Sequence, residues 1–213
     1  MQKRFFFLMW FGFTLLPWNV PATPRVVVSI KPLHSLVSGV MVGVENPELL
    51  ITRNVSVHTY SMSPSEATLL QEAELFFWIG PQLETFLEKP LKNLAKKTKT
   101  VAMIKTKGLQ IHLNDGHLSW FSKEDNELLQ DPHLWLDPLN AIQMVEKIEE
   151  ELKQVDPMHT PKYIENSRIL IEKLKQLHQN LEIDLQTLNK TPFFVFHPAY
   201  TYLEKRYQLN RVG

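Results

Sequence analysis

Residues 161–189 read PKYIENSRILIEKLKQLHQNLEIDLQTLN, and no other segment of this chain constrains its architecture as strongly. Leucine and isoleucine side chains follow one stripe at helical spacing, whereas charged side chains fill the opposite face. The stripe comprises Ile164, Leu170, Leu174, Leu177, Leu181, Leu185 and Leu188. This pattern predicts a helix of about 28 residues, or about 40 Å, which is too long for an ordinary crossover in a small sheet. We expect a strut between two lobes; a plain amphipathic surface helix would differ only in what it packs against.

Before residue 161, hydrophobic runs typical of strands alternate with segments typical of helices. The expected strands cover 25–30, 47–52, 75–79 and 100–104, and the expected helices cover 32–42, 63 onward, 84–97 and 137–154. Ser63 and Glu66 have the spacing of a helix capping box, and Pro90 should kink or split its helix. The alternation predicts an α/β fold in which helices flank a mostly parallel sheet.

The chain therefore divides into three parts after its first residues: an N-terminal lobe, a long linking helix and the start of a second lobe, at 23–156, 157–190 and 191–213. The first lobe contains a polar loop at 105–130. The last part supplies a strand at 191–196 and a short helix at 199–207, and a further loop or strand follows. Because one strand and one helix do not make a stable lobe, we expect the second lobe to be truncated.

The first 22 residues have the pattern of a secretory signal peptide. Lys3 and Arg4 provide the positive start, 5–17 is apolar, and Ala22 is a suitable cleavage position. The apolar run is shorter than the roughly 20 residues of a comfortable membrane span, although a retained anchor is the alternative. We expect export to the periplasm.

Composition excludes several functions. The chain has 213 residues, and its 23 basic and 23 acidic side chains balance to a net charge of +0, which gives no electrostatic reason to expect nucleic acid or an anionic membrane as partner. It contains 0 cysteines, which excludes disulfides, thiolate metal sites, a cysteine nucleophile and a lipid-anchoring N-terminal cysteine.

Three histidines are the candidate metal ligands: His58, His133 and His197. His58 and His197 fall just past expected strands, where ligands bind to parallel sheets. Imidazole without thiolate suits Zn²⁺ better than the oxygen-seeking Mg²⁺ or Ca²⁺. Asp131 is a candidate for orienting the His133 ring. Taken alone, His58 is more simply a turn histidine in a polar loop, and the simple alternative for His133 is a helix-entry residue.

Other polar residues receive simpler interpretations. His112 and His117 lie in the polar loop as solvated residues, with transient zinc collection as the alternative. We expect Glu84, Glu88 and the run 149–151 on solvated helix faces.

Five ordered motifs resemble the periplasmic zinc-binding proteins of ABC transporters, the ZnuA-like members of the TroA group. They are VVSIKPLHSLV at 27–37, HTYSMSPSEA at 58–67, FWIGP at 77–81, DPHLWLDP at 131–138 and FHPAY at 196–200. The resemblance covers the chain from Arg25 to its end. It implies two α/β lobes joined by one rigid helix, with the metal in the cleft between them.

The resemblance also implies a ligand set and a role. His58 and His133 would come from the first lobe and His197 from the second, where manganese- and iron-binding relatives usually carry a carboxylate. Histidine at this position favours Zn²⁺. The implied role is zinc capture in the periplasm and delivery to an inner-membrane ABC permease with its ATPase. No enzymatic activity is implied, and we expect a monomer.

The chain departs from the family pattern in places, which leaves alternatives open. The family continues past Tyr207 and supplies an acidic ligand there, Pro198 replaces a frequent aspartate, and Val57 stands where some members are acidic. The alternatives are a manganese or iron receptor, a non-functional truncated remnant, a secreted zinc hydrolase and an adhesin. The hydrolase lacks support because no His-Glu-x-x-His or Gly-x-Ser-x-Gly motif is present. The missing lipid-anchoring cysteine argues against the adhesin.

Overall fold

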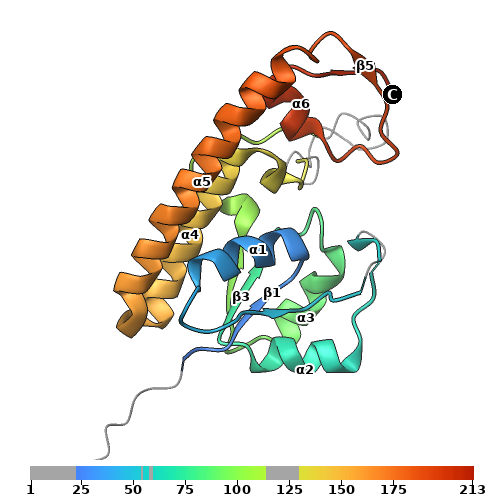
Figure 1. Cartoon of the computed structure of the whole chain (residues 1–213). Coiled ribbons are helices and arrows are strands. Elements are labelled where there is room, and N and C mark those ends of the chain that lie inside the picture. Colours follow the sequence, from blue (N-terminus) through green and yellow to red (C-terminus); the bar gives the residue numbers. More distant parts are fainter. Residues whose placement is uncertain (1–22, 54, 58–59, 114–129) are drawn as a thin grey trace, which may run out of the picture.

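The computed structural model describes residues 23–53, 55–57, 60–113 and 130–213 (Figure 1). The expected signal peptide, His58 and His117 therefore lie outside the described residues. Within the described ranges, no helix combines the length and apolar character needed to cross a membrane.

A four-stranded, fully parallel sheet forms the centre of the larger lobe. Its order is β2-β1-β3-β4. The strands are β1 (Val26–Val28), β2 (Glu48–Leu49), β3 (Leu75–Trp78) and β4 (Lys99–Ala102). The parallel sheet was predicted, but β2 is shorter than the expected 47–52. The expected strand 100–104 was placed too far along, because a 3-10 turn replaces it from Met103 to Lys105.

Side chains alternate between the two faces of this sheet and so build two apolar cores. Val26 and Val28 belong to the core under α1 (Lys31–Val40), whereas Val27 belongs to the core on the opposite face. The first core also takes in α4 (Pro138–Val155) and α5 (Thr160–Gln186). The second is covered by α2 (Pro64–Glu72) and α3 (Glu88–Asn93). The lobe therefore has helices on both faces of the sheet.

The predicted helix starts are confirmed by their caps. Ser63 and Glu66 form the reciprocal capping box of α2. The Asp137 carboxylate accepts a hydrogen bond from the Leu139 amide at 2.9 Å and caps α4. The expected helix 84–97 is split, as Pro90 suggested, into a 3-10 turn at Thr85–Leu87 and the short α3.

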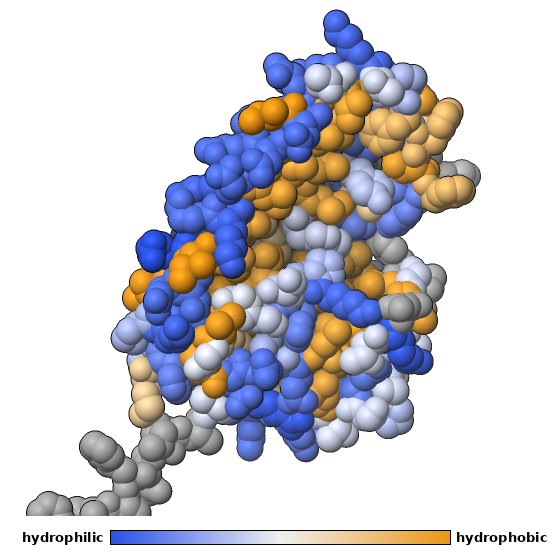
Figure 2. Space-filling view, viewed as in Figure 1, coloured by the Kyte–Doolittle hydropathy of each residue, from blue (hydrophilic) through white to orange (hydrophobic). Residues whose placement is uncertain are grey.

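Helix α5 is the predicted long helix, with 27 residues. It begins at Thr160 after a 3-10 turn (Pro157–His159) and ends at Gln186, three residues before the predicted end, where the chain turns. Its first part lies beside α4 and α1, and its last turns continue beyond them to α6 (Figure 1). Figure 2 shows a hydrophilic outer face along α5 and apolar side chains toward the hollow of the molecule.

Asn166 of α5 fastens the long helix to the end of α1. Its side-chain amide donates hydrogen bonds to the carbonyl oxygens of Val40 and Val42, both at 2.8 Å, and the residue is buried. We expect Asn166→Ala to lower the free energy of unfolding by about 2 kcal/mol, because two carbonyl groups lose their partner. Urea denaturation measures this. Asn180→Ala, on an exposed turn of the same helix, should change it by less than about 0.5 kcal/mol.

Residues 191–213 form a small second sheet with one helix. Strands β5 (Pro192–Phe193) and β6 (Asn210–Arg211) pair in parallel, and α6 (Thr201–Tyr207) connects them. Strand β5 is shorter than the expected 191–196, because Phe194 and Phe196 lie on the surface rather than in a core. This unit lies at the far end of α5, beyond the larger sheet (Figure 1).

Candidate metal centre

A cleft of about 720 Å³ lies where the carboxyl ends of the parallel strands face the small second unit. Segments that follow β1, β2, β3 and β5 contribute to its wall, as does the turn before α4. The lining residues are Ile30, Lys31, Pro32, Ile51, Arg53, Val55, Ser56, Val57, Leu83, His133, Trp135, Leu136, His197, Ala199 and Tyr200. None of these is an aspartate or a glutamate, so the described wall offers imidazole but no carboxylate.

Two of the three predicted histidines meet in this cleft. The ring centroids of His133 and His197 are 5.3 Å apart, with their planes at 74°. His133 is 6% exposed and also contacts Trp135 edge-on at 5.4 Å, whereas His197 follows β5 on the more exposed side. Residues separated by more than sixty positions therefore approach within the range of one shared ion.

Asp131 holds the His133 ring in place. Its Oδ1 accepts hydrogen bonds from the His133 amide at 2.9 Å and from the ring Nδ1 at 2.7 Å, and the carboxyl is fully buried. Burial works against ionisation, but hydrogen bonds from His133 and Thr201 outweigh it and keep the pKa of Asp131 below its ordinary value. Because an ionised carboxylate only accepts, this contact places a proton on Nδ1, and in the neutral tautomer the lone pair lies on Nε2.

The imidazole of His197 is biased toward its neutral form. Burial and the neighbouring His133 together lower the pKa of His197, and Asp131 opposes them only partly. Neutral imidazole is the form that ligates metals.

The remaining predicted site residues lie elsewhere or outside the described residues. His58 is outside them, although Val57 before it lines the cleft. His117 is outside them as well. His112 is half-buried, and its ring packs against Tyr202 at 5.0 Å, away from the cleft wall. Among the described residues, no group of three or more histidine, aspartate or glutamate side chains is placed to hold a metal.

The expectation that Glu84 faces solvent was wrong. Its side chain is 0% exposed and lies behind the cleft, where β1 and β3 end. It accepts hydrogen bonds from the Ser29 hydroxyl at 2.5 Å, the Gly80 amide at 2.9 Å and the Ile79 amide at 3.2 Å. Burial raises the pKa of Glu84 to about 7, against these hydrogen bonds. Glu151, from the run 149–151, is also buried, because it pairs with lysines.

Sequence reasoning also missed the two basic residues of the cleft wall, Lys31 and Arg53. The Arg53 guanidinium donates a hydrogen bond to the Tyr60 hydroxyl at 2.7 Å and lies over its ring. No local pattern distinguishes these two side chains from ordinary surface residues, since their position follows from how the loops after β1 and β2 fold.

A parallel α/β lobe, a smaller α/β unit, a long helix joining them and an imidazole pair in the cleft together define the fold of a two-lobed metal receptor. The family model that matches, ZnuA, described as zinc-uptake complex component A, periplasmic, covers residues 26–213. The chain belongs to this family, whose members are solute-binding receptors rather than enzymes.

Relatives support the same assignment. The high-affinity zinc uptake system protein ZnuA of Brucella abortus (strain 2308) is 35% identical over 222 aligned residues, which cover 88% of this chain. The protein of the same name from Yersinia pestis is 30% identical and covers 92% of this chain. This chain spans 66% of the Brucella protein and 67% of the Yersinia protein.

Solved structures share the fold. The Zn(II)-bound AdcA of Streptococcus pneumoniae superposes with a TM-score of 0.76 at 29% identity, covering 90% of this chain and 39% of that one. A zinc-bound ZnuA lacking residues 138–173 in its own numbering superposes with a TM-score of 0.76 at 26% identity, covering 89% of this chain and 69% of that one.

Proposed function

We propose that this chain binds Zn²⁺ in the periplasm and delivers it to an inner-membrane ABC permease with its ATPase. The observation that supports this most directly is the pair of imidazoles in the cleft, His133 and His197. The relatives named as zinc uptake proteins support the same cargo.

The proposed ligands are His58, His133 and His197, with Asp131 orienting the second. The hydrogen bond from His133 Nδ1 to Asp131 directs Nε2 to the metal and raises its basicity. Since the described cleft wall contributes nitrogen and no carboxylate, the site favours Zn²⁺ over Mn²⁺, which prefers oxygen. His112 and His117 remain candidates for transient zinc collection only.

We further propose that residues 1–22 direct export, that 23–156 and 191–213 act as the two lobes, and that 157–190 joins them rigidly. A receptor of this kind makes and breaks no covalent bond. A monomer suffices for this role.

Zinc titration of the purified chain by calorimetry, with Mn²⁺ as the matched control, tests the proposal. We expect one Zn²⁺ per chain and no measurable binding of Mn²⁺. Preferred binding of Mn²⁺ would point to the manganese- or iron-type receptor. Binding of neither ion by a folded chain would refute the receptor function and favour the non-functional remnant.

A further inference from the structure

Helix α6 is fastened to the larger lobe by two side chains on one of its faces. The Tyr202 hydroxyl donates a hydrogen bond to the Asp131 carbonyl oxygen at 2.7 Å and accepts one from the His112 amide at 3.3 Å. One turn later, the Arg206 guanidinium contacts Asp137 through Nε at 3.0 and 3.1 Å and through Nη2 at 2.5 Å. These two residues hold the small second unit against the larger lobe.

The Tyr202 contact is buried, and the Arg206–Asp137 contact is partly buried. Tyr202 is 0% exposed and Asp137 is 1% exposed. The Asp137 carboxylate is itself fixed, because it caps α4. Arg206 Nη2 also donates to Gln110 Oε1 at 2.7 Å. A multiply hydrogen-bonded arginine–carboxylate pair in this setting fixes orientation as well as distance.

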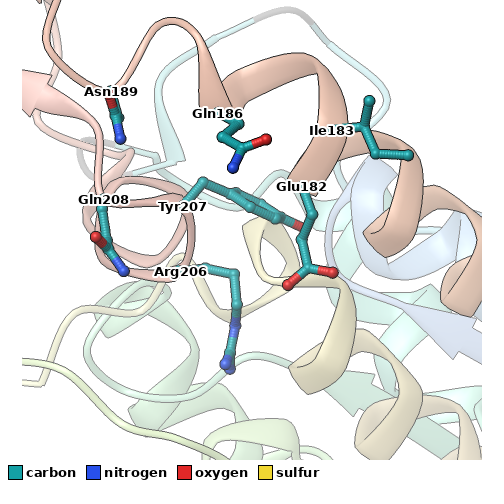
Figure 3. A pocket seen from close by; sticks show the side chains of 7 residues that line it. All are labelled: Glu182, Ile183, Gln186, Asn189, Arg206, Tyr207 and Gln208. Atoms are coloured by element: carbon teal, nitrogen blue, oxygen red, sulfur yellow. The ribbon is translucent and has the colours of Figure 1, made fainter.

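The other side of α6 is fixed to the long helix. The Tyr207 hydroxyl lies 3.0 Å from His178 Nδ1 on α5, beside a pocket of about 430 Å³ between the two helices. Figure 3 shows Arg206 extending from α6 away from Gln186 and Asn189, which line the upper part of this pocket. Helix α6 is therefore hydrogen-bonded both to the larger lobe and to α5.

The contacts of Tyr202 and Arg206 lie on either side of His133 in the candidate metal centre. Asp131 and Asp137 bracket His133 in the segment 131–137, and His197 lies four residues before α6 begins at Thr201. The separation of the two imidazoles is therefore set by a short chain segment on one side and by the α6 contacts on the other.

We infer that Tyr202 and Arg206 are positioning residues that hold His133 and His197 at metal-binding distance before any metal arrives. This rests on the proposed zinc-binding function. Neither residue touches the metal; each acts through the segment that carries a histidine. Binding then costs little reorganisation at this half of the site.

Arg206→Met tests the inference, and Arg211→Met is its matched control, because Arg211 pairs with Glu204 within the small second unit at 2.9 Å. In the metal-free chain, we expect the nuclear Overhauser contact between the rings of His133 and His197 to disappear in Arg206→Met. It should persist in Arg211→Met. Zinc affinity should fall about tenfold in Arg206→Met, fall less in Arg206→Lys, and stay unchanged in Arg211→Met.

Tyr202→Phe keeps the buried ring and removes only the hydroxyl, so it provides a second test if Arg206→Met fails to fold. Like Arg206→Met, Tyr202→Phe should weaken the nuclear Overhauser contact between the two rings and lower zinc affinity. An unchanged contact and unchanged affinity in a folded Arg206→Met or Tyr202→Phe chain would overturn the inference. If the unmodified chain binds no zinc but the ring contact still depends on Arg206, the function fails while the positioning role stands.

Discussion

Replacing His133 with alanine should reduce the zinc affinity of this chain by about a hundredfold or more. Loss of a residue that merely orients a ligand costs 10–100-fold, and loss of a ligand should cost at least the upper end of that range. The buried Asp131 carboxylate would also lose the imidazole that it now holds at 2.7 Å. Competition with a zinc chelator of known affinity measures the change.

His159→Ala is the matched control for this prediction. His159 makes the same kind of contact, with Nδ1 at 2.7 Å from Asp156, but at the junction of α4 and α5 rather than in the cleft. Zinc affinity should not change there. His197→Ala should reduce zinc affinity as much as His133→Ala. Because His197 is more exposed, this substitution should disturb folding less. Equal losses at His133 and His159 would mean that the imidazole–carboxylate pair supports folding and does not bind zinc.

His58→Ala extends the same test to a ligand that only the sequence identifies. A loss as large as that of His133→Ala is expected from the family motif at 58–67. Unchanged zinc affinity in His58→Ala would show that the assignment of this ligand is wrong.

Local sequence signals predicted much of the fold correctly. The parallel sheet follows from the alternation of apolar runs and helical segments, and the caps at Ser63 and Asp137 follow from residue types at fixed spacing. The long helix follows from its apolar stripe. Its end was misplaced by three residues, because Leu188 continues the stripe although the chain has already turned. Periodicity identifies an apolar face but not the point where the backbone leaves it.

The residues that sequence reasoning misjudged or did not single out depend on contacts between distant segments. Glu84 is buried because Ser29, 55 positions earlier, meets it at the end of the neighbouring strand. Arg206 finds Asp137, 69 positions earlier, only once α6 has docked. In each case the residue type alone favours a solvated position, and only the assembled fold supplies the partner. His133 and His197 could be identified as candidate metal ligands because the motifs that contain them are distinctive. No local pattern predicts that the two side chains lie together.

Glu84→Gln should flatten the pH dependence of stability between pH 5 and 8. The carboxyl has a pKa near 4.5 when unfolded and, because of burial, about 7 when folded. Between these values the native state binds more protons than the unfolded state, so the free energy of unfolding falls as pH rises. Over this range the group contributes a decrease of about 2 kcal/mol, which glutamine cannot contribute because it does not titrate.

The comparison of the two chains isolates this group. His197 and His112 have lowered pKa values in the fold and contribute the opposite slope, but both are present in each chain and cancel in the difference. Glutamine also turns an NH₂ toward one of the three donors that surround the carboxylate. We therefore expect an additional loss of about 1–2 kcal/mol that is independent of pH. The prediction is therefore tested by how the free energy of unfolding changes with pH, and not by its value at any one pH.

Urea denaturation at several pH values measures both curves, and Glu88→Gln serves as the control because Glu88 is exposed four residues further on. Its curve should parallel that of the unmodified chain. If the Glu84→Gln curve were also parallel, the carboxyl would keep one charge state from pH 5 to 8, and the hydrogen bonds from Ser29, Ile79 and Gly80 would outweigh burial. A converging pair of curves instead means that the buried Glu84 carboxyl, behind the cleft wall, is neutral below about pH 7 and negatively charged above it.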